Sequence, residues 1–417
     1  MNLYIDPGTG SMLFSIVIGL VSVLWFGVRK LYMFLKYRTA GKIDANKKDI
    51  VIYGEDKRYW TVFKGILDEF EKRKVKVTYL AGSEDDPLLN QKYEYVDVEV
   101  LGLGNKAYAK LNFLNAHIVL ATTPGLDVFQ WKRSKEVDFY AYMTHAIDSG
   151  TAYQMFGTHF FDALLFSSDV FFHTNRVLEE LRNSKPKELI SVGCTYMDYM
   201  MSKKESLSDG DSSEKKETIS VLVAPTWGSS SILNLYGSGF IRQLISTGFD
   251  ITIRPHPQSF ISDAELIGSL MAEFPESELL HWNRDADNFN VMKRSDLLIS
   301  DFSGSIFDYS FIFEKPILYT ELNMDMSEKD QAWLDEPYYG NVLIPRLGKE
   351  LKEESFGELK QVITELVNDT KYHDSIIAAR DEYWQHRGES ARLVTDYLLE
   401  KLKSLTDSKD EVAELKK

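Results

Sequence analysis

Residues 295–320, SDLLISDFSGSIFDYSFIFEKPILYT, contain the pattern that decides the fold of this chain. The apolar run at 297–299 ends in a polar segment with Ser and Gly, as a buried strand does where it enters a loop. Residues 306–314 are predicted to form a short helix, and residues 315–320 the next strand. A strand, a helix and a strand in this order predict a βαβ unit with two parallel strands.

The same alternation continues upstream of this unit. Strands are predicted at 218–228 and 249–257, and helices at 240–248 and 263–274. An earlier series has predicted strands at 47–55, 74–82, 93–102, 116–125, 137–145, 163–174 and 188–193, with helices at 61–73, 105–115 and 175–184. Two such series predict an α/β fold of two Rossmann-like domains facing a cleft, which is a glycosyltransferase-B-like architecture.

Residues 201–217, MSKKESLSDGDSSEKKE, are polar and lack an apolar period, so they are predicted to be a linker or exposed loop. We therefore expect one Rossmann-like domain at 41–200 and a second at 218–375. Residues 376–417 are predicted to form C-terminal helices and a frayed tail.

The composition restricts the class of protein. A hydrophobic fraction of 44% over 417 residues excludes a disordered chain. The net charge of −15 argues against binding to duplex nucleic acid, which needs a basic face. Cys194 is the single cysteine, so the sequence has no internal disulfide framework and no CxxC metal site.

The N-terminal 48 residues carry a net charge of +5, although the chain as a whole is acidic. Residues 12–28 are apolar and uncharged, and basic residues follow them. This order predicts a single membrane-anchoring helix within residues 1–40, at the cell membrane, with the body on the cytoplasmic side. A helix lying in the membrane interface and a helix buried in the protein are the alternatives.

Ligands of doubly wound domains bind at the carboxyl ends of the strands, so the residues that follow each strand are the candidates. RPHPQS, at 254–259, follows one predicted strand. Arg254 offers a planar fork for phosphate oxygens, and His256 suits hydrogen bonding to a phosphoryl group or proton transfer. The alternative is a structural turn with a capping histidine.

SDFSGS, at 300–305, follows another strand and precedes a helix. Ser303, Gly304 and Ser305 are predicted at the helix N-terminus, where free N–H groups and the helix dipole bind anions. An ordinary serine N-cap is the alternative. Asp301 is either a contact for a hydroxyl-bearing group or a brace of the loop.

His145 ends a predicted strand of the first domain, where it would face the second domain. Such an exposed position suits a general base for a hydroxyl group, and a structural histidine is the alternative. The sequence has no GxxxxGK[ST] loop, no GxGxxG after the first strand of either domain and no pair of histidines at metal-binding spacing. We therefore expect neither a cofactor nor a metal ion.

At these segments the chain resembles the CDP-glycerol glycerophosphotransferase family, the teichoic-acid-type polyol-phosphate transferases. The likeness rests on VAPTW at 223–227, RPHP at 254–257, SDFSGSIFDY followed by EKPILYT, and VGCTYMDYM with Gly193 and Asp198. It covers roughly residues 116–400. The resemblance implies that the second domain binds CDP and the first domain the acceptor.

The resemblance also implies the reaction and its residues. A polyol phosphate, glycerol phosphate or ribitol phosphate, would pass from a CDP-activated donor to an acceptor hydroxyl with release of CMP. His145 and His256 match the two important histidines of the family, and Thr226, Asp301 and Asp198 are further candidate contacts to donor or acceptor. Around His145 the sequence departs from the family's Trp-His-Gly segment, because Thr144 and Ala146 replace the flanking residues.

The expected partners are the CDP-polyol donor, the membrane and a lipid-linked glycan or polymer as acceptor, without nucleic acid. A nucleotide-sugar glycosyltransferase or epimerase of the same fold is a second interpretation, which donor choice between CDP and UDP would separate. A membrane-anchored assembly partner without catalytic activity is a third.

Overall fold

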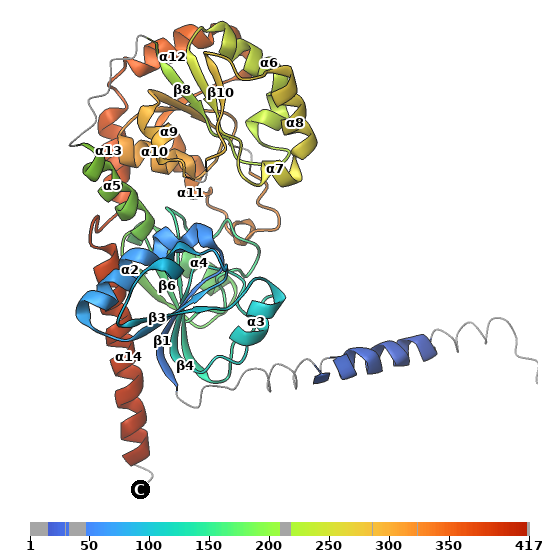
Figure 1. The fold of residues 1–417 in the computed structure, drawn as a ribbon, viewed down its shortest axis with the longest axis vertical. Coiled ribbons are helices and arrows are strands. Elements are labelled where there is room, and N and C mark those ends of the chain that lie inside the picture. The colour runs from blue at the N-terminus through green and yellow to red at the C-terminus, as the bar shows by residue number, and fades with distance from the viewer. Residues whose placement is uncertain are drawn as a thin grey trace, which may run out of the picture.

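The computed structural model describes residues 16–29, 31–32, 47–208, 218–285, 287–322 and 324–414. Two parallel β-sheets, each flanked by helices, form two domains that lie one above the other in Figure 1. The predicted α/β fold of two Rossmann-like domains is therefore confirmed.

The first domain has a seven-stranded sheet in the order β3-β2-β1-β4-β5-β6-β7, and all its neighbouring strands are parallel. Its strands are β1 (Lys48–Gly54), β2 (Val77–Ala81), β3 (Val96–Val100), β4 (Ala116–Ala121), β5 (Val137–Met143), β6 (Ala163–Phe166) and β7 (Glu188–Ser191). The covering helices include α2 (Trp60–Arg73), α3 (Asn105–Leu111) and α4 (Phe172–Leu181). Both faces of β1, β4 and β5 are buried, which explains their near-continuous apolar runs.

The second domain has six parallel strands in the order β10-β9-β8-β11-β12-β13. Its strands are β8 (Ser220–Val223), β9 (Asp250–Ile253), β10 (Leu280–Trp282), β11 (Leu297–Ser300), β12 (Ile317–Tyr319) and β13 (Gly348–Glu350). Its helices include α6 (Ile232–Ser246), α8 (Ala264–Glu273), α10 (Ser305–Phe313) and α12 (Leu359–Val367). Residues 295–320 form the βαβ unit β11-α10-β12, as the sequence predicts.

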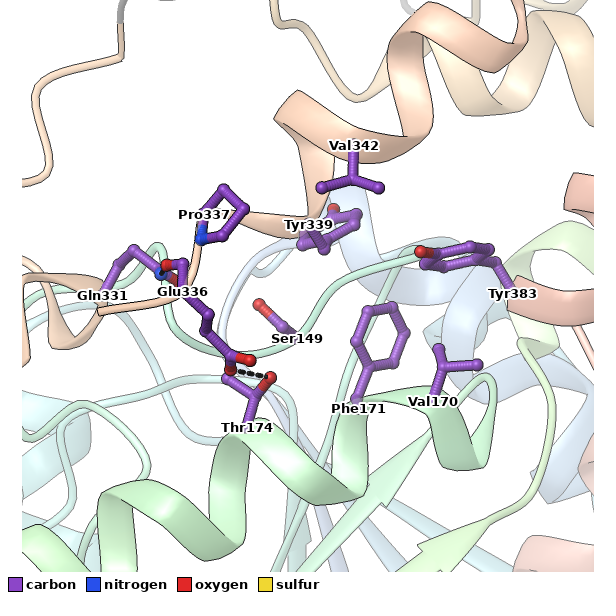
Figure 2. A pocket seen from close by; sticks show the side chains of 10 residues that line it. All are labelled: Ser149, Val170, Phe171, Thr174, Gln331, Glu336, Pro337, Tyr339, Val342 and Tyr383. Atoms are coloured by element: carbon purple, nitrogen blue, oxygen red, sulfur yellow. Dashed lines mark hydrogen bonds between the residues drawn. The ribbon is translucent and has the colours of Figure 1, made fainter. Parts of the chain in front are cut away.

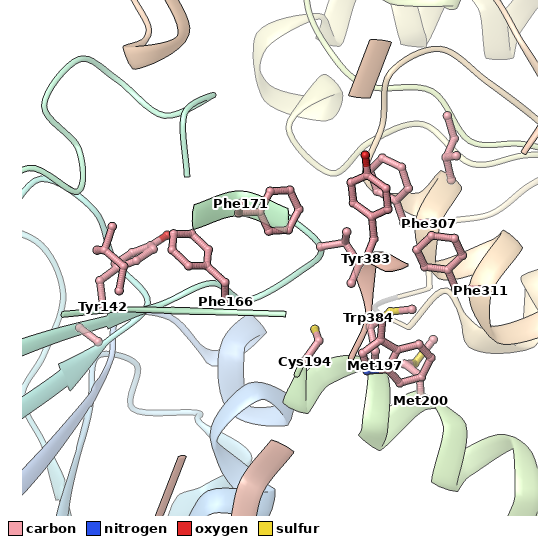
Figure 3. Close-up of a cluster of buried hydrophobic side chains, with 14 of the residues drawn as sticks. Tyr142, Phe166, Phe171, Cys194, Met197, Met200, Phe307, Phe311, Tyr383 and Trp384 are labelled. Atoms are coloured by element: carbon pink, nitrogen blue, oxygen red, sulfur yellow. The ribbon is translucent and has the colours of Figure 1, made fainter. Parts of the chain in front are cut away.

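An apolar core joins the two domains. Figure 3 shows Phe166 and Phe171 of the first domain in the same cluster as Phe307 and Phe311 of α10, with Trp384 among them. All five side chains are almost completely buried. Burial of this continuous apolar surface stabilises the contact between the domains.

Polar contacts support the same interface. Residues 328–331, which follow β12, bond to residues 151–156 of the first domain through backbone groups, as in Gln331 N–H to Thr151 O at 2.9 Å. Arg182 also donates to the buried carboxylate of Asp330, at 2.5 Å. A segment of the second domain is thereby fixed to the first.

Two predicted boundaries are wrong in detail. Helix α5 (Thr195–Ser208) extends into the predicted loop at 201–217, because Lys204 donates to the Ile312 carbonyl at 2.6 Å and Met201 packs on the core. Residues 209–217 lie outside the described residues. Helix α14 (Ser390–Glu414) extends into the predicted frayed tail, since Leu402 and Leu405 pack against the first domain's core. The C-terminal helix thus returns to the first domain, beside α2 (Figure 1).

The N-terminal helix covers residues 16–29 and 31–32, and its apolar side chains are exposed. In the part of the chain that the structure describes, no helix is both long and apolar enough to span a bilayer. The predicted transmembrane helix is therefore not found, because the described helix is shorter than the about 20 apolar residues that a span needs. The remainder of the predicted anchor, residues 1–15, 30 and 33–40, lies outside the described residues.

Candidate active site

Three neighbouring strands of the second domain bring the predicted segments together. Strands β9, β8 and β11 are adjacent, so RPHP, VAPTW and SDFSGS all follow the carboxyl edge of one sheet. Backbone bonds connect them: Arg254 N–H donates to Val223 O at 2.8 Å, and Ala224 N–H to Ile299 O at 3.0 Å. The spatial grouping expected from the strand order is present.

A backbone hydrogen bond defines the neutral tautomer of the His256 imidazole. Its Nδ1 atom accepts a hydrogen bond from the Gln258 backbone N–H at 3.1 Å, so Nδ1 carries a lone pair. In the neutral ring the proton is therefore on Nε2, which is left as a donor. Burial, followed by the positive charges of Arg58 and Arg254, lowers the pKa of His256 and favours this neutral form. Trp227, half-exposed, lies beside it with 6.5 Å between ring centroids.

Arg254 is held by a side chain of the adjacent strand. Its guanidinium Nη1 donates to Asn283 Oδ1, just after β10. Partial burial lowers the pKa of Arg254, but a guanidinium stays charged at neutral pH. The predicted positive group therefore lies at the strand edge beside His256.

The N-terminus of α10 contains the predicted Ser-Gly-Ser segment. The hydroxyls of Ser303 and Ser305 are 2.9 Å apart, and Ser303 O accepts the Ile306 N–H at 3.1 Å. Gly304 is exposed, and a Cβ atom built there would meet no protein atom within 4 Å. The first turn of a nine-residue helix thus has open space in front of it, as an anion site requires.

Asp301 braces these loops and is not available to a ligand. Its carboxylate is fully buried and accepts backbone N–H bonds from Thr226 at 2.9 Å and from Phe302 at 2.8 Å. It also accepts bonds from Ile232 and Ser303. Burial raises the pKa of Asp301 to about 6, against the effect of these bonds. Of the two predicted roles for Asp301, the structure has the loop brace; Thr226, partly exposed, remains at the strand edge.

Asp198 also has a structural role. It lies in α5, and its two carboxylate oxygens accept the N–H groups of Gly388 at 2.9 Å and Ser390 at 3.1 Å. It therefore caps the start of α14. The donor or acceptor contact at Asp198 stays a prediction.

His145 follows the carboxyl end of β5 in the first domain. Its Nδ1 lies 3.2 Å from Thr122 Oγ1, at the end of the adjacent strand β4, and the Tyr59 ring packs on it with centroids 5.0 Å apart. Burial, then the charge of Arg58, lowers the pKa of His145 to about 4. The ring is neutral at pH 7, which is the form that accepts a proton.

Arg58 relates the two histidines and was missed by the sequence reasoning. Its charge lowers the pKa of both His145 and His256, although they belong to different domains. Contacts between the domains also lie near the turn that contains Arg58: Thr195 Oγ1 donates to Val62 O in α2, and Tyr196 donates to Asp308 in α10. The one sequence signal for Arg58 is its position shortly after β1, because residues that follow strands are candidates for ligand binding.

Two further features bear on ligands. Among the described residues, no group of three His, Cys, Asp or Glu side chains could hold a metal ion. Figure 2 shows a pocket of about 190 Å³ between the domains, where Phe171, Tyr339 and Tyr383 surround Ser149. Glu336 in this pocket accepts a hydrogen bond from Thr174 at 2.6 Å. The pocket is lined by none of the predicted site residues.

The architecture and site define a class: enzymes of glycosyltransferase-B-like fold that act between two Rossmann-like domains. The profile of the CDP-glycerol:poly(glycerophosphate) glycerophosphotransferase family matches residues 161–400. This match covers more than half of the chain, so the chain belongs to that family of transferases. The predicted family and enzyme class are confirmed. The match includes His256 and the α10 N-terminus, whereas His145 precedes it.

Solved structures of the same fold have low sequence identity to this chain. A variant of the wall teichoic acid polymerase TagF soaked with CDPG shares 15% identity, with a TM-score of 0.53, over 94% of this chain and 98% of that one. A putative UDP-N-acetylglucosamine 2-epimerase from Listeria monocytogenes shares 14%, with a TM-score of 0.55, over 83% and 94%. S. aureus MnaA with UDP shares 13%, with a TM-score of 0.56, over 86% and 97%. No curated protein matches the sequence.

Proposed function

We propose that this enzyme transfers a polyol phosphate, glycerol phosphate or ribitol phosphate, from a CDP-linked donor to an acceptor hydroxyl. The acceptor would be a lipid-linked glycan or surface polymer, and CMP would be released. The observation that carries the proposal is the family match over residues 161–400, within which adjacent strands bring Arg254, His256 and Ser303 to one edge of the second sheet. The family and the fold of TagF, whose structure contains CDPG, support the choice of donor.

His145 is proposed as the general base. The acceptor oxygen attacks the β-phosphorus of the donor, and a new P–O bond forms. The P–O bond to CMP breaks, and the hydroxyl proton passes to a ring nitrogen of His145. If Nδ1–H donates to Thr122, the lone pair is on Nε2, away from the strand end.

The second domain is proposed to bind the diphosphate. The positive end of the α10 dipole, with the hydroxyls of Ser303 and Ser305, suits its oxygens. Arg254 and the Nε2–H donor of His256 would stabilise charge on the transferred phosphoryl group and on the departing CMP.

We also propose that the enzyme works at the inner face of the cell membrane. The exposed apolar side chains of residues 16–28, followed by basic residues, support this location. Co-sedimentation with anionic lipid vesicles tests it. Leu24→Glu should reduce the bound fraction, and equal binding of both chains would contradict this proposal.

CMP release tests the reaction. Purified protein is incubated with CDP-glycerol or CDP-ribitol and a hydroxyl-bearing acceptor, and CMP and product are quantified. The fold of the UDP-bound MnaA favours one alternative, a UDP-sugar enzyme. Thermal unfolding with CDP, UDP, GDP and ADP separates the two, because a ligand of the folded state raises the midpoint. A shift with UDP alone would favour the alternative.

A further inference from the structure

The proposed site has well-defined donors on the second domain, but one face of the transferred phosphoryl group would point to the first domain. Its three equatorial oxygens share negative charge during transfer. A cation on the first domain would complete their neutralisation. Arg58 is suited to this role by its position and by the orientation of its guanidinium group.

The guanidinium of Arg58 is oriented by its own turn. Asp56 Oδ1 accepts both the backbone N–H and the side-chain Nε–H of Arg58, each at 2.9 Å. The side chain is 65% exposed, and within the described residues neither of its terminal nitrogens has a hydrogen-bond partner. One edge of the fork is fixed, and the other two nitrogens remain available to an anion.

A chain of contacts places this turn near the N-terminus of α10. Arg58 lies in the short helix η1 (Lys57–Tyr59), directly before α2. In the first turn of α2, Val62 O accepts a bond from Thr195 Oγ1 at 2.7 Å, at the start of α5. The next residue, Tyr196, donates to Asp308 in the first turn of α10, at 3.1 Å.

The same turn lies beside the proposed base. Tyr59 follows Arg58 and packs its ring on His145, and the Arg58 guanidinium carbon lies 5.9 Å from the centroid of the Tyr59 ring. Arg58 therefore lies beside the ring that packs on His145, and the contacts through Thr195 and Tyr196 lead from its turn to the second domain. Its influence on the pKa of His256 agrees with this placement.

We propose that Arg58 binds an oxygen of the phosphoryl group that is transferred, from the side opposite Arg254 and His256. This inference rests on the proposed function. It adds a substrate-binding residue of the acceptor domain, one that contacts the donor's phosphate.

Arg58→Gln tests the inference, with Lys57→Gln as a matched control. Lys57 lies on the same turn, but its ammonium pairs with Asp85. Lys57 is not among the charges that lower the pKa of His145 or His256. Arg58→Gln should lower kcat/KM for CDP-glycerol about 100-fold, as loss of a phosphoryl-stabilising donor does. The kcat/KM of Lys57→Gln should stay within about twofold of that of the parent chain. Arg58→Lys should lose less kcat/KM than Arg58→Gln, because lysine keeps the positive charge but lacks the planar guanidinium.

The pH profile gives a second measure. The charged groups that act on the two histidines are Arg58 for His145, and Arg58 with Arg254 for His256. Removing the Arg58 charge should raise both pKa values and move the acidic limb of kcat/KM to higher pH, while Lys57→Gln leaves it in place. The thermal midpoint of both variants should match that of the parent chain, because both side chains are exposed.

The outcomes separate this inference from the proposed function. Equal kcat/KM for the two glutamine variants would overturn the role of Arg58 while leaving the reaction intact. An effect restricted to KM of a phosphate-bearing acceptor, absent with a neutral acceptor such as glycerol, would also overturn it, because the phosphate would then belong to the acceptor. If the parent chain releases no CMP, the proposed function fails. Calorimetric binding of CDP-glycerol then tests the Arg58 contact by itself, and about tenfold weaker binding by Arg58→Gln supports that contact. Equal binding by the two chains, or none, overturns it.

Discussion

The Nδ1 atom of His256 accepts the backbone N–H of Gln258, at 3.1 Å. A backbone N–H can only donate, so this bond fixes the neutral tautomer with its proton on Nε2. The bond comes from the turn of RPHPQS itself, between residues two apart. The local sequence therefore presents a hydrogen-bond donor, rather than a base, at the edge of the second sheet.

The first prediction follows from this tautomer. His256→Gln keeps an N–H donor on a side chain of similar reach, whereas His256→Ala removes it. We expect His256→Ala to lower kcat about 100-fold or more, and His256→Gln to retain a larger share of the rate. Steady-state CMP release measures both. Equal losses in the two variants would contradict a donor role.

The second prediction concerns pH and His145. Burial and the charge of Arg58 lower the pKa of His145 to about 4, and a general base must be unprotonated to act. The base is neutral at pH 7 and becomes protonated as the pH falls through about 4. We expect a first loss of kcat/KM near pH 6, where the loop brace Asp301 becomes protonated, and a fall of about tenfold per pH unit below about 4, where His145 does.

Two controls accompany that profile. The unfolding midpoint at each pH shows whether the chain is still folded. His145→Ala should lower the transfer rate about 100- to 10,000-fold while leaving CDP binding unchanged. A transfer rate that is unaffected by His145→Ala, with donor binding intact, would refute the base assignment.

The third prediction uses the open space before α10. Gly304 has helical dihedral angles, φ −57° and ψ −22°, so alanine fits the backbone without strain. Its methyl group would occupy space that no protein atom fills and that the donor phosphate needs. Gly304→Ala should keep the thermal midpoint within a few degrees and weaken CDP-glycerol binding about tenfold.

Gly268→Ala is the matched control for that variant. Gly268 is exposed in α8 and equally open, but it lies outside the predicted segments. Calorimetry on both variants should show weaker binding only for Gly304→Ala. Unchanged affinity at Gly304 would place the diphosphate elsewhere.

The fourth prediction separates structure from binding at Asp198. This carboxylate caps the start of α14 through Gly388 and Ser390, so Asp198→Ala should lower the free energy of unfolding by about 1–2 kcal/mol. The KM for the donor should not change. A raised KM together with an unchanged denaturation midpoint would support the prediction of a ligand contact instead.

These residues show how far the sequence alone could lead. Apolar runs with polar residues at their ends predicted most strands, and with them the grouping of Arg254, His256 and Ser303 at one sheet edge. Strands β10 (LHW) and β13 (GKE) were missed because, unlike the equally short β12 (ILY), they lack a continuous apolar run. The partners of a carboxylate cannot be predicted from its neighbours in the sequence. Asp301 and Asp198 accept backbone N–H groups from segments that are distant along the chain.

Arg58 is a site residue that the sequence alone could not predict. It lies in a polar segment without a motif, and its relation to His256 exists only after two domains pack together. The contacts through Val62, Thr195 and Asp308, which join α2, α5 and α10, are tertiary. Spacing along the chain could not have shown it.

The decisive measurement of donor choice is CMP release from CDP-glycerol and CDP-ribitol, with UDP-N-acetylglucosamine as a comparison donor. We expect the parent chain to release CMP from a CDP-polyol in an acceptor-dependent manner, and His145→Ala to abolish most of this release. No UDP should form from the UDP-sugar. UDP release or epimerisation without any CMP release would contradict the assignment of a polyol-phosphate transferase.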